Sequence, residues 1–172
     1  MRIDLGAIAK GYIADRVIDY LKRKNVTAAM INLGGNVLTY GPNRNRSDNK
    51  WYIGIQHPEL ERGNNVGIIK VDNQSVVTSG IYERKLVHDG KTYHHIFDPR
   101  TGYPIETKMA SITIVADLSV DCEIWTTRLF GLPIIEAMMI IERTVGIEGI
   151  IITKDHRIAI SQGLRSKYQS LY

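Results

Sequence analysis

The pattern of apolar and polar positions predicts one helix, then a series of strands, then two helices and a closing hairpin. In residues 6–24, apolar side chains recur at helical spacing, which predicts a helix whose apolar face carries Ile8, Tyr12, Ile13, Val17 and Leu21. Gly6 and Gly11 stand at the start of this helix, although each costs about 1 kcal/mol in a helix relative to Ala. Their presence suggests that another part of the molecule comes close to the helix start.

Apolar runs separated by turn residues predict the strands. They cover residues 27–33, read as a buried strand, and residues 36–41, 51–57, 66–72, 75–87, 92–98 and 110–116. Asp89-Gly90 is typical of a two-residue hairpin turn. Ser119 is expected to cap a helix over the following residues, and Pro133 to open the next helix. Residues 149–161 read as a hairpin about Asp155 and His156. This order predicts an α+β fold with a mostly antiparallel sheet.

Length and composition narrow the class of protein. A chain of 172 residues with 44% hydrophobic residues fits one domain, residues 1–172. No apolar stretch approaches the roughly 18 residues that span a bilayer, and we expect no signal peptide or lipid-attachment motif in this chain. The net charge of +4 comes from scattered basic residues, which argues against nucleic acid and is compatible with an anionic ligand. Cys122 is the only cysteine, so an internal disulfide or a cysteine-based zinc site is excluded.

Residues 93–104 (YHHIFDPRTGYP) contain the candidate functional residues of the central strands. If residues 93–98 form a strand, His95 shares a face with Tyr93 and Phe97, and His94 lies on the opposite face, so the two histidines do not serve one site. Asp98 to Gly102 fits a type I turn whose first carboxylate caps the turn. Taken alone, this pattern favours a hairpin corner with a solvated histidine.

Two further segments carry possible ligands. The turn and helix start in residues 4–11 (DLGAIAKG) leave N–H groups free, and with the charge of Lys10 they favour an anion, although a strand–helix junction explains the small residues equally. Glu123 and Thr127 are four residues apart, so they share one helix face. A carboxylate and a hydroxyl are hard oxygen ligands suited to Mg²⁺. The alternative is an exposed polar pair.

Five segments, in this order, resemble the ApbE-type FAD:protein FMN transferase family: DLGAIAKGYIAD, INLGGN, VVTSGIYER, HHIFDPRTGYP and TTRLFG. The resemblance covers nearly the whole chain, and the HIFDPRTGYP block is its most specific part. It implies a T-fold-like α+β architecture of which this chain is the C-terminal portion, with the N-terminal part absent. It also implies a Mg²⁺-dependent enzyme that takes FAD, releases AMP and attaches FMN to a Thr or Ser hydroxyl of an acceptor protein.

The resemblance assigns roles to particular residues. His95 falls at the catalytic histidine, which takes the proton of the acceptor hydroxyl, whereas His94 falls at a variable position. Because strand alternation places His94 on the other face, its replacement is expected to be nearly silent. The implied metal contacts are Glu123, Thr127 and the carbonyl of Ala7. The implied cofactor contacts are Lys10, Asn32, Gly34, Gly35, Ser79, Gly80, Tyr82, Asp98 and Thr101. Glu123 stands where most members have Asp, so Asp121 remains an alternative carboxylate, and Ile81 replaces a common Asp.

Three functions stay open at this point. The first is the flavin transferase; the second is a Mg²⁺-dependent FAD pyrophosphatase in which water replaces the acceptor; the third is a non-catalytic flavin-binding fragment or subunit. The expected partners are FAD and an acceptor protein, with no nucleic acid. The resemblance implies an extracellular or lipid-anchored full-length protein. An apolar face exposed by the absent portion would favour a homo-oligomer.

Overall fold

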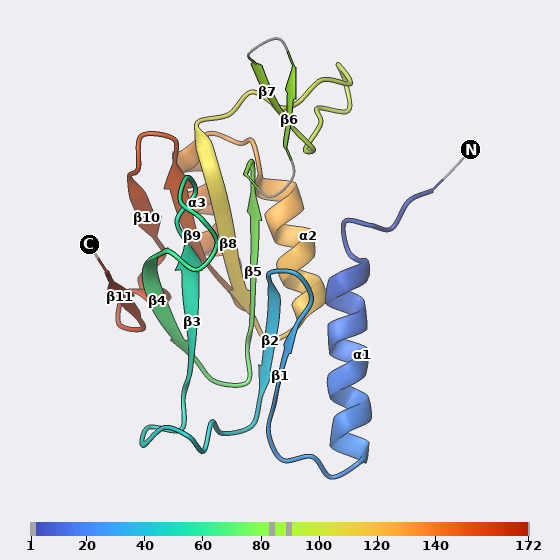
Figure 1. Cartoon of the computed structure of the whole chain (residues 1–172), viewed down its shortest axis with the longest axis vertical. Coiled ribbons are helices and arrows are strands. Elements are labelled where there is room, and N and C mark those ends of the chain that lie inside the picture. The colour runs from blue at the N-terminus through green and yellow to red at the C-terminus, as the bar shows by residue number, and fades with distance from the viewer. Residues whose placement is uncertain (1–2, 83–84, 89–90, 172) are drawn as a thin grey trace.

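The computed structural model describes residues 3–82, 85–88 and 91–171. Its centre is an antiparallel six-stranded sheet in the order β1-β2-β5-β8-β9-β10 (Figure 1). The six strands are β1 (Ala29–Asn32), β2 (Asn36–Tyr40), β5 (Ser75–Gly80), β8 (Met109–Ala116), β9 (Ile147–Thr153) and β10 (Ile158–Ile160). The α+β architecture with antiparallel sheets that the sequence predicted is confirmed.

Two smaller sheets, three α-helices and one short 3₁₀ helix accompany the central sheet in the described part of the chain. A three-stranded sheet, in the order β11-β4-β3, consists of β3 (Trp51–Gln56), β4 (Asn65–Val71) and β11 (Tyr168–Ser170). A separate hairpin of β6 (Lys85–His88) and β7 (Lys91–His94) projects from one end of the molecule (Figure 1). The helices are α1 (Ala9–Arg23), α2 (Ser119–Leu129), α3 (Ile134–Arg143) and the short 3₁₀ helix η1 (Gln162–Leu164). In the described part of the chain, no helix is long and apolar enough to cross a membrane.

The central sheet is covered on both faces. Its residues Ile112 and Ile114 belong to an apolar core that includes Leu129 of α2 and Ile141 of α3. Val115 of the same strand belongs to a second core, which includes Ile53, Ile55 and Ile69 of the three-stranded sheet. Every residue of β8 is therefore buried, including the polar residues Ser111 and Thr113, which alternate with apolar ones along the strand.

The strand predictions are largely confirmed, with corrections at their ends. β1 alternates between partly buried and exposed residues because it is an edge strand, so the prediction of a buried strand was wrong. The run 75–87 is not one strand: β5 ends at Gly80 and β6 begins at Lys85. β7 ends at His94 rather than at residue 98. The sequence did not predict β11, and the turn at Asp89-Gly90 lies outside the described residues.

The packed face of α1 differs from the predicted one. Tyr12 and Ile13 are 57% and 50% exposed, whereas Gly11, Ala14, Asp15 and Ile18 are buried. A Cβ atom on Gly11 would lie 2.5 Å from the carbonyl oxygen of Ser119. The predicted close approach at the helix start is confirmed at Gly11. The face was misassigned because the small residues that permit this contact contribute little to an apolar pattern.

The start of α2 is capped from α1 and not by Ser119. Ser119 is the first helical residue, and no side chain of the segment itself caps the helix. Instead, the buried carboxylate of Asp15 accepts hydrogen bonds from the backbone N–H of Ser119 (2.8 Å) and of Val120 (3.0 Å). A carboxylate at a helix N-terminus is stabilising because the first N–H groups lack partners within the helix. This contact fixes α2 relative to α1.

Candidate functional site

The predicted site residues gather where α1 begins, where β1 turns into β2, along α2, and in the segment that follows β7 (Figure 1). Hydrogen bonds and an ion pair join the first three of these elements directly. Lys10, Glu123 and the glycine turn at residues 34–35 are therefore drawn from distant parts of the sequence to one end of the central sheet.

Glu123 is the buried carboxylate of this site. Only 5% of the residue is exposed, and its Oε1 atom accepts a hydrogen bond of 2.8 Å from the Nδ2 atom of Asn36. The ammonium group of Lys10 lies 3.5 Å from the same oxygen. A buried charge requires a partner, and Asn36 and Lys10 supply a polar one and a charged one. The alternative interpretation of Glu123 as an exposed polar residue is therefore excluded.

Asn36 is a functional candidate that sequence reasoning missed. It is fully buried, and its Oδ1 atom accepts a hydrogen bond of 2.8 Å from the hydroxyl of Ser119. Hydrogen bonds at its oxygen and at its nitrogen thus fix the orientation of the Asn36 amide. One signal was available in the sequence: Asn36 opens a strand of mostly apolar residues, where a core side chain would be expected.

The glycine turn beside this network has a backbone that favours glycine. Gly34 and Gly35 have φ values of +64° and +94°, and the side chain of Asn32 accepts a hydrogen bond of 3.0 Å from Gly35 N–H. All three residues are exposed. Asn32 therefore shapes the turn, and the two glycines leave its surface without side chains. Ala7 lies in the exposed turn before α1, close in sequence to Lys10.

His94 has a structural role that the strand pattern did not reveal. It is buried; its Nε2 atom lies 3.1 Å from the Ile105 carbonyl oxygen, and its Nδ1 atom accepts a hydrogen bond of 3.3 Å from Ile96 N–H. Its ring meets Phe130 edge-on, with 6.3 Å between the ring centres. Burial lowers the pKa of His94, so the ring is held in the neutral form that these contacts require.

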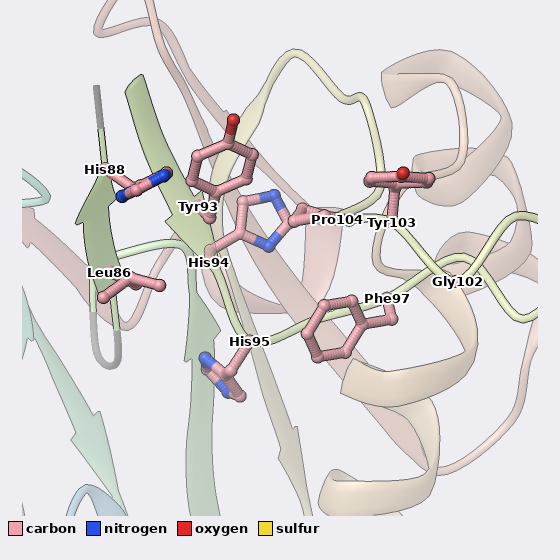
Figure 2. Close-up of a pocket in the computed structure, with 9 residues that line it drawn as sticks. All are labelled: Leu86, His88, Tyr93, His94, His95, Phe97, Gly102, Tyr103 and Pro104. Carbon is pink, nitrogen blue, oxygen red and sulfur yellow. The ribbon is translucent and has the colours of Figure 1, made fainter. Parts of the chain in front are cut away.

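His95 follows the end of β7, in a bend of the chain, and is exposed. Figure 2 shows its ring pointing away from that of Tyr93, near Phe97. Both histidines line one cavity of about 590 Å³, together with Tyr93, Phe97 and Tyr103. Strand alternation placed the two histidines on opposite faces, but β7 ends at His94, so both residues border this cavity. Tyr93, His95 and Phe97 border this cavity, but they do not form the predicted strand face, because β7 ends at His94.

The corner after His95 has the predicted turn. The backbone carbonyl of Asp98 accepts hydrogen bonds from Thr101 N–H (3.2 Å) and Gly102 N–H (2.8 Å), and its carboxylate accepts one from Arg100 N–H (2.9 Å). The guanidinium of Arg100 also bonds both carboxylate oxygens, and these contacts lower the pKa of Asp98. The carboxylate of Asp98 is thus engaged in holding the corner.

Thr127 faces a second cavity, of about 970 Å³, on the other side of this corner. Asp98, Arg100, Thr101 and Arg128 line it with Thr127. Phe97, Tyr103 and Pro104 line both cavities, so they separate the side of His95 from the side of Thr127. The structure places Thr127 on the same helix as Glu123, but Thr127 is exposed and Glu123 is buried.

The remaining predicted residues lie at the end of β5. Ser79 and Gly80 pair with Ile112 and Ser111 of β8, and the ring of Tyr82 covers the position of a Cβ on Gly80. None of these three residues lines either of the two cavities. Within the described part of the chain, no three His, Cys, Asp or Glu side chains gather closely enough to hold a metal ion.

Fold and site together define a class of protein: an antiparallel α+β protein with a buried, lysine-paired carboxylate on a helix whose last turn borders a cavity lined by arginines, which adjoins a cavity lined by histidine. Its sequence over residues 1–151 matches the model of the ApbE family. The chain belongs to the ApbE family.

Relatives with assigned names agree with this membership. The chain is 44% identical over 171 residues to an FAD:protein FMN transferase of Klebsiella pneumoniae, covering 99% of this chain and 52% of that protein. It is 35% identical over 177 residues to one from Treponema pallidum, covering 99% and 49%. The crystal structure of the ApbE protein of Thermotoga maritima superposes with a TM-score of 0.84 at 32% identity, covering 94% of this chain and 52% of that one. The chain thus spans about half the length of these relatives.

Proposed function

We propose that the protein carrying this chain is an FAD:protein FMN transferase, and that this chain supplies the base, the acceptor side and the metal carboxylate. Membership in the ApbE family supports this proposal, as do the names of the relatives from Klebsiella pneumoniae and Treponema pallidum. The observation that carries it is the division of the site by the corner at residues 97–104. The histidine lies on one side of that corner, and the hydroxyl and the arginines lie on the other.

The reaction balances as a substitution at phosphorus. The acceptor Thr or Ser oxygen forms a bond to the phosphorus of the FMN half of FAD, and the bond from that phosphorus to the bridging oxygen breaks, so that AMP leaves. The hydroxyl proton passes to His95, whose imidazole is a common general base near neutral pH. Phosphoryl transfer depends mainly on positioned groups and charge, and the exposed bend at His95 leaves room for a protein acceptor.

The two cavities fit the geometry of such a substitution. The attacking and leaving oxygens lie roughly in line, on opposite sides of the phosphorus. On this proposal, the acceptor enters the cavity of His95, and the AMP half of FAD lies in the cavity of Thr127, where Arg128 offers positive charge and Arg100 is paired with Asp98. The phosphorus would then lie near the residues shared by both cavities. Thr101 and Asp98 would contribute to the nucleotide side.

Mg²⁺ is the metal implied by the resemblance, and the donor set fits it. Mg²⁺ is commonly held by one or two carboxylates and the phosphates of its substrate. The Lys10 ammonium already places a cation 3.5 Å from Glu123 Oε1, which shows that this carboxylate is reached by positive charge. Glu123 and Thr127 would hold the ion, with the exposed turn at Ala7 as a further contact and Asp121 as the alternative carboxylate. When bound, the ion offsets charge on the pyrophosphate.

The hydrolytic alternative has one observation in its favour. Because His95 is exposed, water reaches the place where the acceptor hydroxyl would lie. The same chemistry would then split FAD into FMN and AMP without an acceptor. The non-catalytic alternative, a flavin-binding fragment or subunit, predicts instead that FAD binds without reacting. From family resemblance alone, we further propose that the natural-length protein acts outside the cytoplasm as a lipid-anchored protein.

The test incubates the natural-length protein with FAD, MgCl₂ and a Thr-containing peptide, and measures both AMP release and flavin fluorescence on the peptide. Transfer to the peptide supports the proposal. AMP release without a flavin-bearing peptide points to the hydrolase. FAD binding with neither AMP release nor transfer points to the non-catalytic flavin-binding subunit. His95→Ala should lower the rate about 10²–10⁴-fold. The matched control is His57→Ala, the same change at a residue that lines neither cavity.

A further inference from the structure

The site contains a chain of buried polar contacts that joins three elements. Asp15 of α1 holds the first N–H groups of α2, the Ser119 hydroxyl donates to Asn36 of β2, and Asn36 donates to Glu123 of α2. Ser119 and Asn36 have no exposed surface, and Asp15 and Glu123 are 6% and 5% exposed. A fully satisfied buried network of this kind orients its members rigidly.

The orientation of the Asn36 amide follows from chemistry. An ionised carboxylate only accepts hydrogen bonds, so the atom of Asn36 that faces Glu123 must be the NH₂ group. The carbonyl oxygen of Asn36 therefore faces Ser119, whose hydroxyl donates to it at 2.8 Å. Asn36 thus fixes the Oε1 atom of Glu123 at one place without supplying charge.

Lys10, unlike Asn36, is a partner of Glu123 that another cation could replace. Its side chain is 46% exposed, its ammonium lies 3.5 Å from Oε1, and it sits in the first turn of α1. A long, half-exposed lysine side chain has freedom to move into solvent at small cost. The buried carboxylate therefore has one permanent polar partner and one removable cation.

We propose that Lys10 is a built-in counter-cation that a divalent metal ion displaces from Glu123, while Asn36 is the positioning residue that holds the carboxylate in both states. This inference rests on the proposed function, since that function places the metal at Glu123. The metal ion and the Lys10 ammonium exclude one another at Glu123, because the same negative charge of the carboxylate attracts both. In the metal-bound state the freed ammonium is available to the phosphates of FAD, close to the helix start that already favours anions.

The experiment measures metal affinity directly, apart from turnover. Mn²⁺ is titrated into the natural-length protein, and free Mn²⁺ is followed by its electron paramagnetic resonance signal. Lys10→Met should raise the affinity by about two- to fivefold, because it removes a competing, partly exposed cation. The matched control is Lys22→Met on the same helix, where the lysine lies over the Tyr40 ring and should leave the affinity unchanged.

The positioning role of Asn36 is tested by comparing substitutions of Asn36 and Ser119. Asn36→Leu should lower the Mn²⁺ affinity about 10–100-fold, as the loss of a group that orients a metal ligand commonly does. Ser119→Ala removes the neighbouring bond but keeps the contact with Glu123, and should change the affinity far less. If the two variants lose stability and affinity to the same degree, Asn36 is merely structural and the positioning role is overturned. Lys10→Met keeps the proposal testable if Asn36→Leu does not fold.

The outcomes separate the inference from the proposed function. An affinity of Lys10→Met equal to or below that of Lys22→Met overturns the exchange, as does the absence of Mn²⁺ binding in the unaltered protein. FMN transfer measured on the same preparations is read independently. If the protein transfers FMN but Lys10→Met gains no Mn²⁺ affinity, the proposed displacement of Lys10 is overturned and the proposed function stands. Lack of transfer with the expected gain in affinity removes the proposed function and leaves the exchange in place.

Discussion

The Nε2 atom of His94 lies 3.1 Å from the carbonyl oxygen of Ile105, and this contact joins the end of β7 to the far side of the corner that follows it. Between these two residues lie His95 and the turn at Asp98. The corner is also closed by backbone hydrogen bonds between Ile105 and Ile96 (3.0 Å) and between Asp98 and Tyr103 (2.9 Å). The position of His95 therefore depends on its buried neighbour.

His94→Ala is expected to be damaging, in contrast to the nearly silent change that strand alternation predicted. The substitution removes two hydrogen bonds and leaves a cavity beside Phe130, so we expect a loss of about 1–3 kcal/mol in the free energy of unfolding. Urea unfolding of both proteins measures this loss. A variant with unchanged stability would show that the His94 contacts do not hold the corner.

The stability of the protein should also depend on pH through His94. Its pKa is lowered in the folded state by burial, so on acidification the unfolded chain takes up the proton first. The stabilising contribution is thus complete above about pH 6.5, the ordinary pKa of histidine, and decreases as the pH falls below it. Urea unfolding between pH 5 and 8 should show a slope that His94→Gln reduces. Equal slopes in the two proteins would contradict the assignment.

Gly11→Ala should destabilise the protein at the contact between α1 and α2. The added Cβ atom would lie 2.5 Å from the backbone carbonyl oxygen of Ser119, so one of the two helices must shift. We expect a cost of about 1–3 kcal/mol, as for other overpacked sites, measured by thermal or urea unfolding. Gly6→Ala is the matched control, because its Cβ would meet only the side chain of Asp4. Equal effects of the two substitutions would argue against a close helix contact.

Cys122 should be unreactive in the folded protein. It is fully buried, and burial raises the pKa of its thiol to about 12. Since the thiolate is the reactive form, Ellman's reagent at pH 8 should label the native protein only as fast as it unfolds. In urea, one thiol per chain should react at once. Rapid labelling of the native protein would show that α2 opens locally.

Self-association is expected through the exposed face of α1. Tyr12, Ile13, Val17 and Tyr20 of this helix are between 38% and 57% exposed. Light scattering over a range of concentrations should show a mass above that of the monomer, and Ile13→Glu combined with Tyr20→Glu should reduce it. A monodisperse monomer at high concentration would contradict this prediction.

Local patterns were enough to predict the elements that depend on neighbouring residues. The Asp98 turn, the hairpin about Asp155 and His156, and the strand β8 follow from turn residues or strand-forming residues, and the structure contains all three. The predicted face of α1 was wrong, because small residues at a close contact leave almost no apolar signal. The role of His94 was missed because the sequence does not mark the residue at which a strand ends.

By itself, the sequence determined the fold class, the family and the residue types available for chemistry, since these depend on periodicity, turn residues and ordered motifs. Only the tertiary structure decided which of those residues meet. Glu123 pairs with Asn36 and Lys10 across separations of 87 and 113 residues, and Asp15 reaches Ser119 across 104. Such contacts arise from the packing of α1 and α2 on the central sheet. No local pattern encodes them, because a hydrogen bond depends on distance and direction in space.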